Sequence, residues 1–543
     1  MERDFDYIVV GGGSAGCVAA TRLVRDLGAR VLLIERGAAR GSPLLRMPAG
    51  YMKFLGREDY LEMHAAVPQP QLDGRAPVVP QARLLGGGSA VNAMVYMRGQ
   101  HEDYDGWDAF LGGNTGWSYA DMLPHFTRME RNTRLGPPYH GEQGTLIVGD
   151  PGRIDPMSHA YMAAIESLGI PRNADFNGER QAGVGPMQHT YGRQGRSSVV
   201  TAFLDQVRRD PRLTIATGAL ATRLLIERGR AVGVAYTSRD GATEARAGTE
   251  VLVAAGTYNT AKLLMLSGIG PAAHLSAHDI GVVADLPGVG ENLQDHHEVP
   301  VISAARRPMG YHGQDRGWRM LRNGVQYLLT HGGPVATTGV ECCAFLDPDG
   351  GERPTIQLYF VPTVYVDRDV TDVAATWGCT LTPCLLRPKA RGTVRLRSAD
   401  PADKPLVDCR FFGHPDDLRL TLAAIRFARR VLAAPPLVDL VAREMLPGPA
   451  AQSDDDLARH ARRMVKTNYH PVGTARMGPP GDPMAVLDAR LRVRGVDALR
   501  VIDCAAIPFI PSGNTNAAAL ALGSRAAALI REETAPAAAR AAA

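Results

Sequence analysis

Three glycines and an acidic residue near the start of the chain have the spacing of a dinucleotide site. Gly11, Gly13 and Gly16 form a G-x-G-x-x-G pattern directly after an apolar run. Such glycines allow a tight turn, a close approach of a pyrophosphate to the backbone, and close packing of a helix on a strand. Glu35 follows at close to the spacing of about 20 residues that places an acid on an adenosine ribose 2′-hydroxyl. The pattern therefore predicts a dinucleotide site, and the alternative is a glycine-rich loop without a ligand. The carboxylate argues against a 2′-phosphate, although the adjacent Arg36 keeps NADP open.

A histidine near the other end of the sequence could act on protons. His470 stands directly before Pro471, between a predicted helix and the turn at Gly473. A neutral imidazole can take a hydroxyl proton near neutral pH, but a single histidine is also a common structural residue. His296 and His297 read as capping or surface groups of a loop. No set of His, Asp and Glu residues has metal-ligand spacing, and no G-x-S-x-G motif is present, so we expect no metal.

The elements predicted around these residues form a nucleotide-binding unit. The sequence predicts a buried strand over 5–10, a helix over 15–27 and a second strand over 31–34. A second glycine-rich stretch, 83–99, reads as a further wall of the cofactor site that enters a helix near Asn92, or else as a flexible loop. A strand that ends on Gly256 and runs into a helix repeats the first unit, so we expect the same sheet to continue there.

The middle of the chain, about 297–460, changes character. Alternating segments predict antiparallel strands and a long amphipathic helix follows them, which together suggest a domain on the substrate side. Residues 40–80 read as a loop-rich excursion, 213–226 and 232–236 as paired strands, and the tail from Glu532 as disordered. The predicted segments of the second half are strands at 355–360, 380–386, 392–396 and 498–506 and helices at 416–433 and 517–530.

Composition excludes several classes of protein. The chain has 543 residues, 45% of them hydrophobic and 21% charged, and a net charge of only +4 without a dense basic block, which argues against nucleic-acid binding. Seven cysteines without a C-x-x-C pair predict neither a disulfide framework nor a zinc site and favour a reducing compartment. The first strand leaves no room for a signal peptide, and no apolar run reaches the roughly 18 residues that span a bilayer. We therefore expect a cytoplasmic protein, with a peripheral membrane contact left open.

Four stretches taken together closely resemble the glucose-methanol-choline (GMC) oxidoreductases, which are FAD enzymes that oxidise alcohols. Within that family the chain is most similar to bacterial choline dehydrogenase-like and aliphatic or aryl alcohol dehydrogenases. The resemblance covers nearly the whole chain. The stretches that carry it are the glycine pattern through Glu35, 83–107, 256–271 with 287–296, and 470–478 with Asp503 and 512–516.

The resemblance implies an α/β fold. It consists of a Rossmann-like FAD-binding domain and a discontinuous α+β substrate domain built on an antiparallel sheet. We expect the FAD-binding domain to comprise 1–155, 196–296 and 466–531, and the substrate-binding domain to comprise 156–195 and 297–465. Residues 532–543 would form the disordered tail.

The resemblance also assigns roles to single residues. His470 matches the family's active-site base and Asn514 the residue across from it, whereas a turn-forming asparagine is the alternative for Asn514. Ala221 matches a backbone contact to adenine, and Asp503 a contact near the ribityl chain and phosphate. Val91 stands where some relatives carry a histidine that binds FAD covalently, so the resemblance implies noncovalent FAD. The expected cofactor-binding residues are Gly11, Gly13, Ser14, Ala15, Gly16, Glu35, Arg36, Gly88, Asn92, Ala93, Met94, Val95, Ala221, Asp503 and Thr515.

The implied reaction is oxidation of a primary alcohol, aliphatic or aryl and alternatively choline-like, to the aldehyde. The base removes the hydroxyl proton, a hydride passes to flavin N5, and the electrons go to a quinone or other acceptor. An oxidase that produces hydrogen peroxide is the main alternative, and a non-redox lyase, a photodecarboxylase or an NAD-dependent dehydrogenase are others. Glu341 either faces the pocket and attracts a cation or pairs with an arginine, and the oligomeric state stays open.

Overall fold

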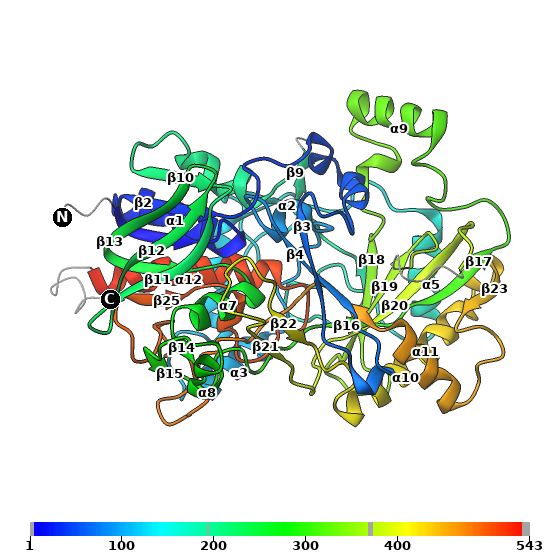
Figure 1. Ribbon diagram of the computed structural model, residues 1–543. Coiled ribbons are helices and arrows are strands. Elements are labelled where there is room, and N and C mark those ends of the chain that lie inside the picture. The colour runs from blue at the N-terminus through cyan, green and yellow to red at the C-terminus, as the bar shows by residue number, and fades with distance from the viewer. Residues whose placement is uncertain (1–4, 193–194, 367–372, 535–543) are drawn as a thin grey trace.

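Two β-sheets lie side by side and carry most of the fold (Figure 1). The structure is a computed structural model that describes residues 5–192, 195–366 and 373–534. One sheet takes its strands from 5–35, 213–253 and 499–501, and the other takes most of its strands from 297–467. This arrangement confirms the predicted α/β class with a Rossmann-like part and an antiparallel part.

The first sheet has a parallel core. Strand β1 lies between β2 and β13, β10 extends the sheet beyond β2, and β25 pairs with β13. Two further strands, β11 and β12, form a hairpin that continues antiparallel from the first half of β13. The strands are β1 (Phe5–Val10), β2 (Val31–Glu35), β10 (Leu213–Thr217), β11 (Leu220–Glu227), β12 (Arg230–Ser238), β13 (Gly241–Val253) and β25 (Leu499–Val501).

Helices from both ends of the chain pack together against this sheet. The predicted helix after the first glycines is α1 (Ser14–Leu27), and it packs against α12 (Asn516–Thr534). A Cβ atom at Gly523 would lie 2.3 Å from the Ala15 carbonyl oxygen, so a larger residue could not maintain this close helix contact. Ile8 and Val9 on β1 are fully buried because the sheet is covered on both faces, as in other parallel sheets.

The second sheet is antiparallel and eight-stranded. Helices α5 (Pro156–Ser167) and α10 (Pro415–Leu432) pack on it. Strands β16 and β24 form a short pair beside β20. The main order is β23 (Val441–Leu446), β17 (Val301–Ala305), β20 (Gly378–Leu385), β19 (Ile356–Val361), β18 (Cys342–Leu346) and β7 (Gly183–Pro186), and the short strands are β16 (His297–Glu298) and β24 (Lys466–Thr467).

Several predicted elements have other bounds. The strand expected over 213–226 is two strands, because the chain turns at Gly218, where φ is +64°, between β10 and β11. The segment expected over 498–506 forms only β25 and a 3-10 turn, Cys504–Ala506. The segment near 392–396 is β21 (Thr393–Arg395), which pairs with β22 (Leu406–Asp408) outside the large sheet.

Two segments differ more strongly from expectation. The loop-rich region contains a hairpin of β3 (Leu61–Ala65) and β4 (Val78–Ala82). The helix expected to begin near Asn92 is instead the single turn α2 (Gly88–Val91), after which the backbone is extended. Helix α12 continues through Thr534, so the predicted disordered tail was wrong for 532–534, and 535–543 lie outside the described residues.

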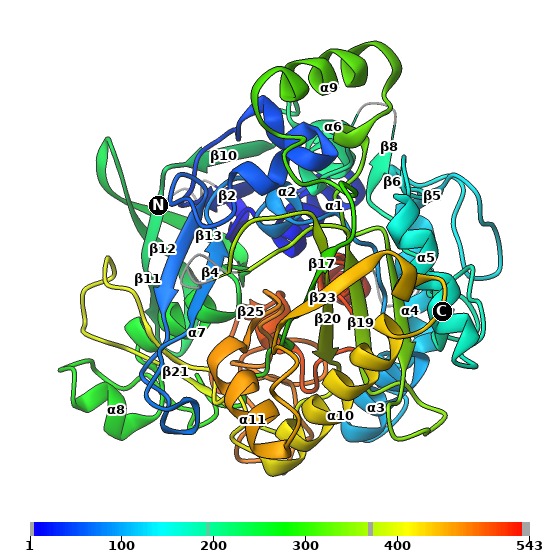
Figure 2. The same cartoon turned by 90° about the vertical axis from the view of Figure 1, so that its right-hand side faces the viewer.

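The remaining helices lie around the two sheets (Figure 2). They are α3 (His101–Phe110), α4 (Tyr119–Met129), α6 (Asp205–Val207), α7 (Thr257–Leu266), α8 (Ala272–Ser276), α9 (Gly317–Thr330) and α11 (Asp454–Met464). Among the described residues no helix combines the length and apolar character needed to cross a bilayer. The predicted domain boundaries stay a prediction; β24 begins at the proposed boundary of 466 yet pairs with β16.

Candidate active site

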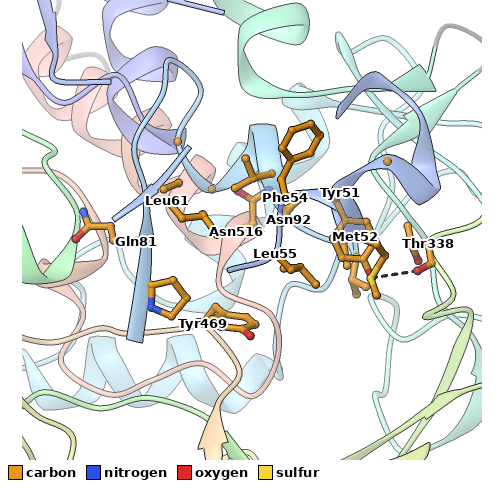
Figure 3. Close-up of a pocket in the computed structure, with 18 of the residues that line it drawn as sticks. Tyr51, Met52, Phe54, Leu55, Leu61, Gln81, Asn92, Thr338, Tyr469 and Asn516 are labelled. Atoms are coloured by element: carbon orange, nitrogen blue, oxygen red, sulfur yellow. Dashed lines mark hydrogen bonds between the residues drawn. The ribbon is translucent and has the colours of Figure 1, made fainter. Parts of the chain in front are cut away.

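A cavity of about 1130 Å³ lies where the two sheets meet. Its walls come from the loop after β1, the β3–β4 hairpin, strand β19 and the segment before α12. Figure 3 shows Gln81 and Thr338 on opposite sides of this cavity, with Asn92 and Asn516 between them. The predicted site residues that line it are Gly11, Gly13, Ser14, Ala15, Glu35, Arg36, Gly88, Asn92, Ala93, Val95, Ala221, His470, Asp503, Asn514 and Thr515.

The first glycine pattern is shaped by close backbone contacts on one side and open space on the other. Gly11 has φ +109°, and a Cβ atom there would lie 2.1 Å from the Ala254 carbonyl oxygen. A Cβ atom at Gly16 would lie 2.0 Å from the Gly11 carbonyl oxygen, and Gly16 does not line the cavity. Gly13 faces the cavity, where a Cβ atom would meet nothing within 4 Å. Because α1 begins at Ser14 without a side-chain cap, its first N–H groups and the open space at Gly13 fit a phosphate group.

The acid at the end of β2 is held by backbone donors. Glu35 is 8% exposed and accepts hydrogen bonds from the N–H groups of Gly12 (2.9 Å) and Gly37 (2.7 Å). Burial raises the pKa of this carboxyl, which the two hydrogen bonds oppose. The neighbouring Arg36 forms an ion pair with Glu62, so a carboxylate already engages its guanidinium. This arrangement fits a ribose hydroxyl better than a 2′-phosphate.

The second glycine stretch packs directly against the first. A Cβ atom at Gly87 would lie 2.7 Å from the Cα atom of Gly13. Beyond the turn of α2, the side-chain oxygen of Asn92 accepts from the Met94 N–H (3.0 Å) and from Arg196 Nη1 (2.7 Å). Met94 is fully buried with φ +62° and lies behind the cavity wall, so the structure does not place it among the lining residues.

Asp503 joins the end of the parallel sheet to the start of α7. Its Oδ2 accepts from the Gly256 N–H (2.7 Å) and from Thr260 Oγ1 (2.6 Å), and its Oδ1 accepts from the Ala505 N–H (2.8 Å). Burial raises the pKa of this carboxyl. The residue therefore fixes the cavity wall, and its predicted contact with the cofactor stays a prediction.

The two glycine stretches and Glu35 together form a cradle that fits an extended dinucleotide such as FAD. The open space at Gly13 suits a pyrophosphate, the carboxylate of Glu35 suits a ribose, and the cavity continues from there to His470 and Asn514. Asn516 lies at the start of α12, lines the same cavity and accepts a hydrogen bond from Ser14 Oγ (2.8 Å). Its side chain links the two chain ends at the site, a role that the sequence did not reveal.

His470 lies at the cavity wall within a chain of hydrogen bonds. Its Nδ1 is 3.0 Å from Nδ1 of His296, and its Nε2 is 3.1 Å from the side-chain nitrogen of Asn514. Its backbone N–H donates to Asp295 (2.9 Å), which holds the loop before Pro471. The structure thus brings together the predicted pair, His470 and Asn514.

The acceptors in this chain determine the protonated nitrogen of each ring. Nε2 of His296 lies 2.9 Å from the Leu386 carbonyl oxygen, which can only accept, so this nitrogen carries the proton. The neutral His296 ring then accepts at Nδ1 from the Nδ1–H of His470. It follows that Nε2 of His470 carries no proton, and its lone pair accepts a hydrogen bond from the side-chain nitrogen of Asn514. The side-chain oxygen of Asn514 accepts from the Tyr359 hydroxyl (3.2 Å). Nε2 of His470, a residue that lines the cavity, is therefore a base.

Burial keeps both rings neutral. It lowers the pKa of His296 to about 4. Burial and the neighbouring His296 lower the pKa of His470 well below its usual value of 6.5. Near neutral pH the Nε2 atom of His470 is therefore free to accept a proton.

Two interpretations of the sequence were wrong. His296 and His297 are 1% exposed, and neither is a surface group; His297 packs against Phe411 and Phe412. Glu341 neither faces the cavity nor pairs with an arginine in the part of the chain that is described. It is fully buried and accepts hydrogen bonds from Ser158, Thr337, Tyr311 and the Asp155 N–H.

Nearly the whole chain is similar to known proteins. Models of the GMC oxidoreductase family match residues 5–298 and 388–523. An alcohol dehydrogenase [acceptor] of Pseudomonas putida is 38% identical, with 97% of this chain and 95% of that protein covered. An oxygen-dependent choline dehydrogenase of Brucella anthropi is also 38% identical, with the same coverage. Formate oxidase of Aspergillus oryzae, in a structure concerned with FAD modification, has a TM-score of 0.90 at 26% identity over 98% of this chain and 99% of its own.

The matches extend over both sheets, and they include relatives above 30% identity that cover 97% of this chain. The resemblance found in the glycine pattern and the loop of His470 is therefore confirmed over the whole fold. This chain belongs to the GMC oxidoreductase family.

Proposed function

We propose that this protein uses noncovalently bound FAD to oxidise a primary alcohol to the aldehyde and passes the electrons to a quinone or another acceptor. The observation that carries the proposal is the hydrogen-bond chain from Leu386 through His296 to His470, which leaves a base at the cavity wall. The similarity to an alcohol dehydrogenase and a choline dehydrogenase supports an alcohol as substrate.

The side chains have separate tasks in this reaction. Nε2 of His470 takes the hydroxyl proton of the alcohol. The Nδ1–H of His470 stays hydrogen-bonded to Nδ1 of His296, which does not take that proton because burial lowers the pKa of His296 to about 4. The amide nitrogen of Asn514, which donates to His470 in this structure, donates to the substrate oxygen. The glycine cradle and Glu35 would hold FAD, which would supply the two-electron oxidant for the substrate carbon.

The charges at the cavity favour a neutral aliphatic or aryl alcohol over a choline-like one. Glu341 is buried away from the cavity. Glu298 lines the cavity but forms an ion pair with Lys466 (2.8 Å), which also lines it, so the pair contributes little net charge there. A choline-like alcohol therefore stays the alternative substrate.

The acceptor and the setting complete the proposal. A dehydrogenase is favoured, and an oxygen-using oxidase that yields hydrogen peroxide is the second candidate because formate oxidase shares the fold closely.

All seven cysteines are free, which supports a reducing, cytoplasmic setting. The protein as purified should be yellow, and anaerobic titration with a panel of alcohols should bleach it.

Bleaching by alcohols would exclude a lyase or a photodecarboxylase, whereas a colourless protein or a flavin that no alcohol bleaches would refute the proposal. Hydrogen peroxide production in air would decide between the two acceptors.

Replacement of the base tests the role of His470 directly. We expect His470→Ala to keep FAD bound but to slow flavin reduction by at least about 10²-fold, the lower end for a positioned base. Stopped-flow absorbance at the flavin band measures this rate. Near-normal reduction would show that another group removes the proton.

A further inference from the structure

Helix α9 (Gly317–Thr330) projects from the body of the molecule (Figures 1 and 2). Several of its large apolar side chains are exposed. Six of the fourteen large apolar residues exposed in the described part of the chain lie on this one helix. The exposed fraction reaches 78% for Leu329, 70% for Leu321 and 66% for Trp318. A cluster of this kind on one element indicates a contact surface.

The apolar side chains form one stripe along the helix. Trp318, Leu321, Val325, Leu328 and Leu329 recur at intervals of three or four residues. The opposite face holds the helix to the body, where Asn323 and Tyr327 are buried and Asn323 donates to the Gln314 carbonyl oxygen (3.0 Å). An ordinary surface helix has the reverse arrangement, with the apolar stripe inward.

Arginines stand beside this stripe. Arg316, Arg319 and Arg322 are exposed, and no carboxylate in the described ranges forms an ion pair with them. The helix itself contains no Asp or Glu, and the adjacent Asp315 pairs with Lys53 (2.7 Å). A helix with Trp and Leu on one face and arginines at its border has the composition of a helix that lies in a membrane interface.

We propose that α9 docks this protein onto a membrane surface that contains anionic phospholipids. The leucines and Trp318 would enter the boundary between headgroups and acyl chains, while the arginines would bind the headgroup phosphates. A second copy of the chain fits less well, because a symmetric contact through α9 would bring like-charged arginines together.

The position of the cavity adds a consequence. Met320 and Leu328 of α9 both line the cavity and are exposed. The same holds for Leu44 and Met52, which lie on the turns Pro43–Arg46 and Pro48–Lys53. The cavity therefore reaches the surface beside the docking helix. An apolar alcohol or quinone could then pass between the bilayer and the cavity without crossing water. This consequence rests on the proposed function, whereas lipid binding does not.

Vesicle binding by the holoprotein tests the proposal. We expect the wild type to cosediment with vesicles of phosphatidylcholine and phosphatidylglycerol, to bind pure phosphatidylcholine weakly, and to lose binding as salt is added. Leu321→Glu/Leu329→Glu should lower the partition coefficient by at least about 10-fold, because each side chain loses the burial of a leucine. Neither residue lines the cavity.

Matched variants separate docking from general effects of charge. Val78→Glu/Val282→Glu changes two exposed valines away from α9 and should bind vesicles as the wild type does. The Leu321→Glu/Leu329→Glu variant should reduce its flavin at the wild-type rate with a water-soluble alcohol. If the wild type ignores anionic vesicles, if both double variants bind equally, or if light scattering shows a dimer that the Leu321→Glu/Leu329→Glu variant dissociates, the proposal is wrong. Vesicle binding by a protein that oxidises no alcohol would leave docking intact and refute the proposed function alone.

Discussion

The protonation state of His470 gives the reaction its expected pH dependence. The active form is the neutral imidazole, and burial with His296 holds the pKa of His470 well below 6.5. Lowering the pH from neutral to 6.5 should therefore leave the rate of flavin reduction by alcohol unchanged, and the rate should fall only as the pH drops through the lowered pKa. In the unfolded chain the pKa returns to about 6.5, so this group lowers the free energy of unfolding as the pH falls below that value. A rate that declines from pH 7 with an apparent pKa near 6.5 would contradict the assignment.

His296 should act as a positioning residue that sets the tautomer of His470. His296→Leu removes the acceptor for the Nδ1–H of His470, whereas His296→Asn offers an amide oxygen near the same place. We expect the leucine variant to lose about 10–100-fold in kcat, comparable to the loss of other groups that orient a functional histidine, and the asparagine variant to regain most of it. KM and FAD content should change little. Equal losses in the two variants would mean that His296 only fills space.

These residues differ in how far the sequence revealed them. His470 and Asn514 stand in stretches that match a family pattern, so their pairing could be predicted. His296 also ends a matching stretch, 287–296, but no role was predicted for it, because a histidine after an aspartate in a loop has no periodicity that indicates burial and its partner lies 174 positions away. Glu341 was misjudged for a similar reason: two of the hydroxyl groups that bind it, those of Ser158 and Tyr311, lie 183 and 30 positions away in the sequence.

At the scale of elements, the sequence predicted correctly those helices and strands that depend on residues close together in the chain. The unit β1–α1–β2 follows from an apolar strand, a glycine turn and a helical repeat, all within one short stretch. The β3–β4 hairpin was not predicted because Pro80 lies within β4. A proline is tolerated there because β4 pairs on one side only. The long β13 was recognised only in its last three residues, 251–253, which are buried, since its first residues are largely exposed.

The glycine turn between β1 and α1 allows a matched test of the cofactor cradle. Gly11→Ala should destabilise the protein by at least about 1 kcal/mol and lower its FAD content, because the methyl group meets the Ala254 carbonyl at a positive φ. Gly13→Ala should leave the stability of the apoprotein within about 0.5 kcal/mol, because the space is open. It should still reduce the FAD content, since the methyl group enters the predicted pyrophosphate position. Thermal melts of the apoprotein and the flavin-to-protein absorbance ratio measure both effects, and normal FAD content in Gly13→Ala would place the pyrophosphate elsewhere.

At the scale of the molecule, one cavity joins both sheets and both ends of the chain. Such an arrangement could not be predicted from periodicity, because it depends on which sheet edges meet. Gly13 and Asn516 are in the cavity wall together with Tyr359 from the antiparallel sheet. A ligand that fills this space therefore holds together segments that are far apart in the sequence.

Removal of the cofactor should weaken the whole fold. Acid precipitation should release the flavin into the supernatant, because Val91 offers no histidine for attachment. The apoprotein prepared under milder conditions should melt at a lower temperature, and added FAD should restore the melt; at 100 times Kd the gain is about 2.7 kcal/mol. Flavin that stays with the precipitate would demonstrate a covalent bond, and equal melting of both forms would show that the cavity is stable on its own.

The contact between α1 and α12 also constrains the order of events during synthesis. The strand β25 and the helix α12 complete the layer that β1 and α1 begin, and more than four hundred residues separate these parts. A nascent polypeptide can fold its antiparallel middle while translation continues, but the nucleotide cradle lacks its partner helix until residue 534 has left the ribosome. Flavin loading is thus a late step, and premature termination anywhere before β25 would yield a product unable to retain the coenzyme.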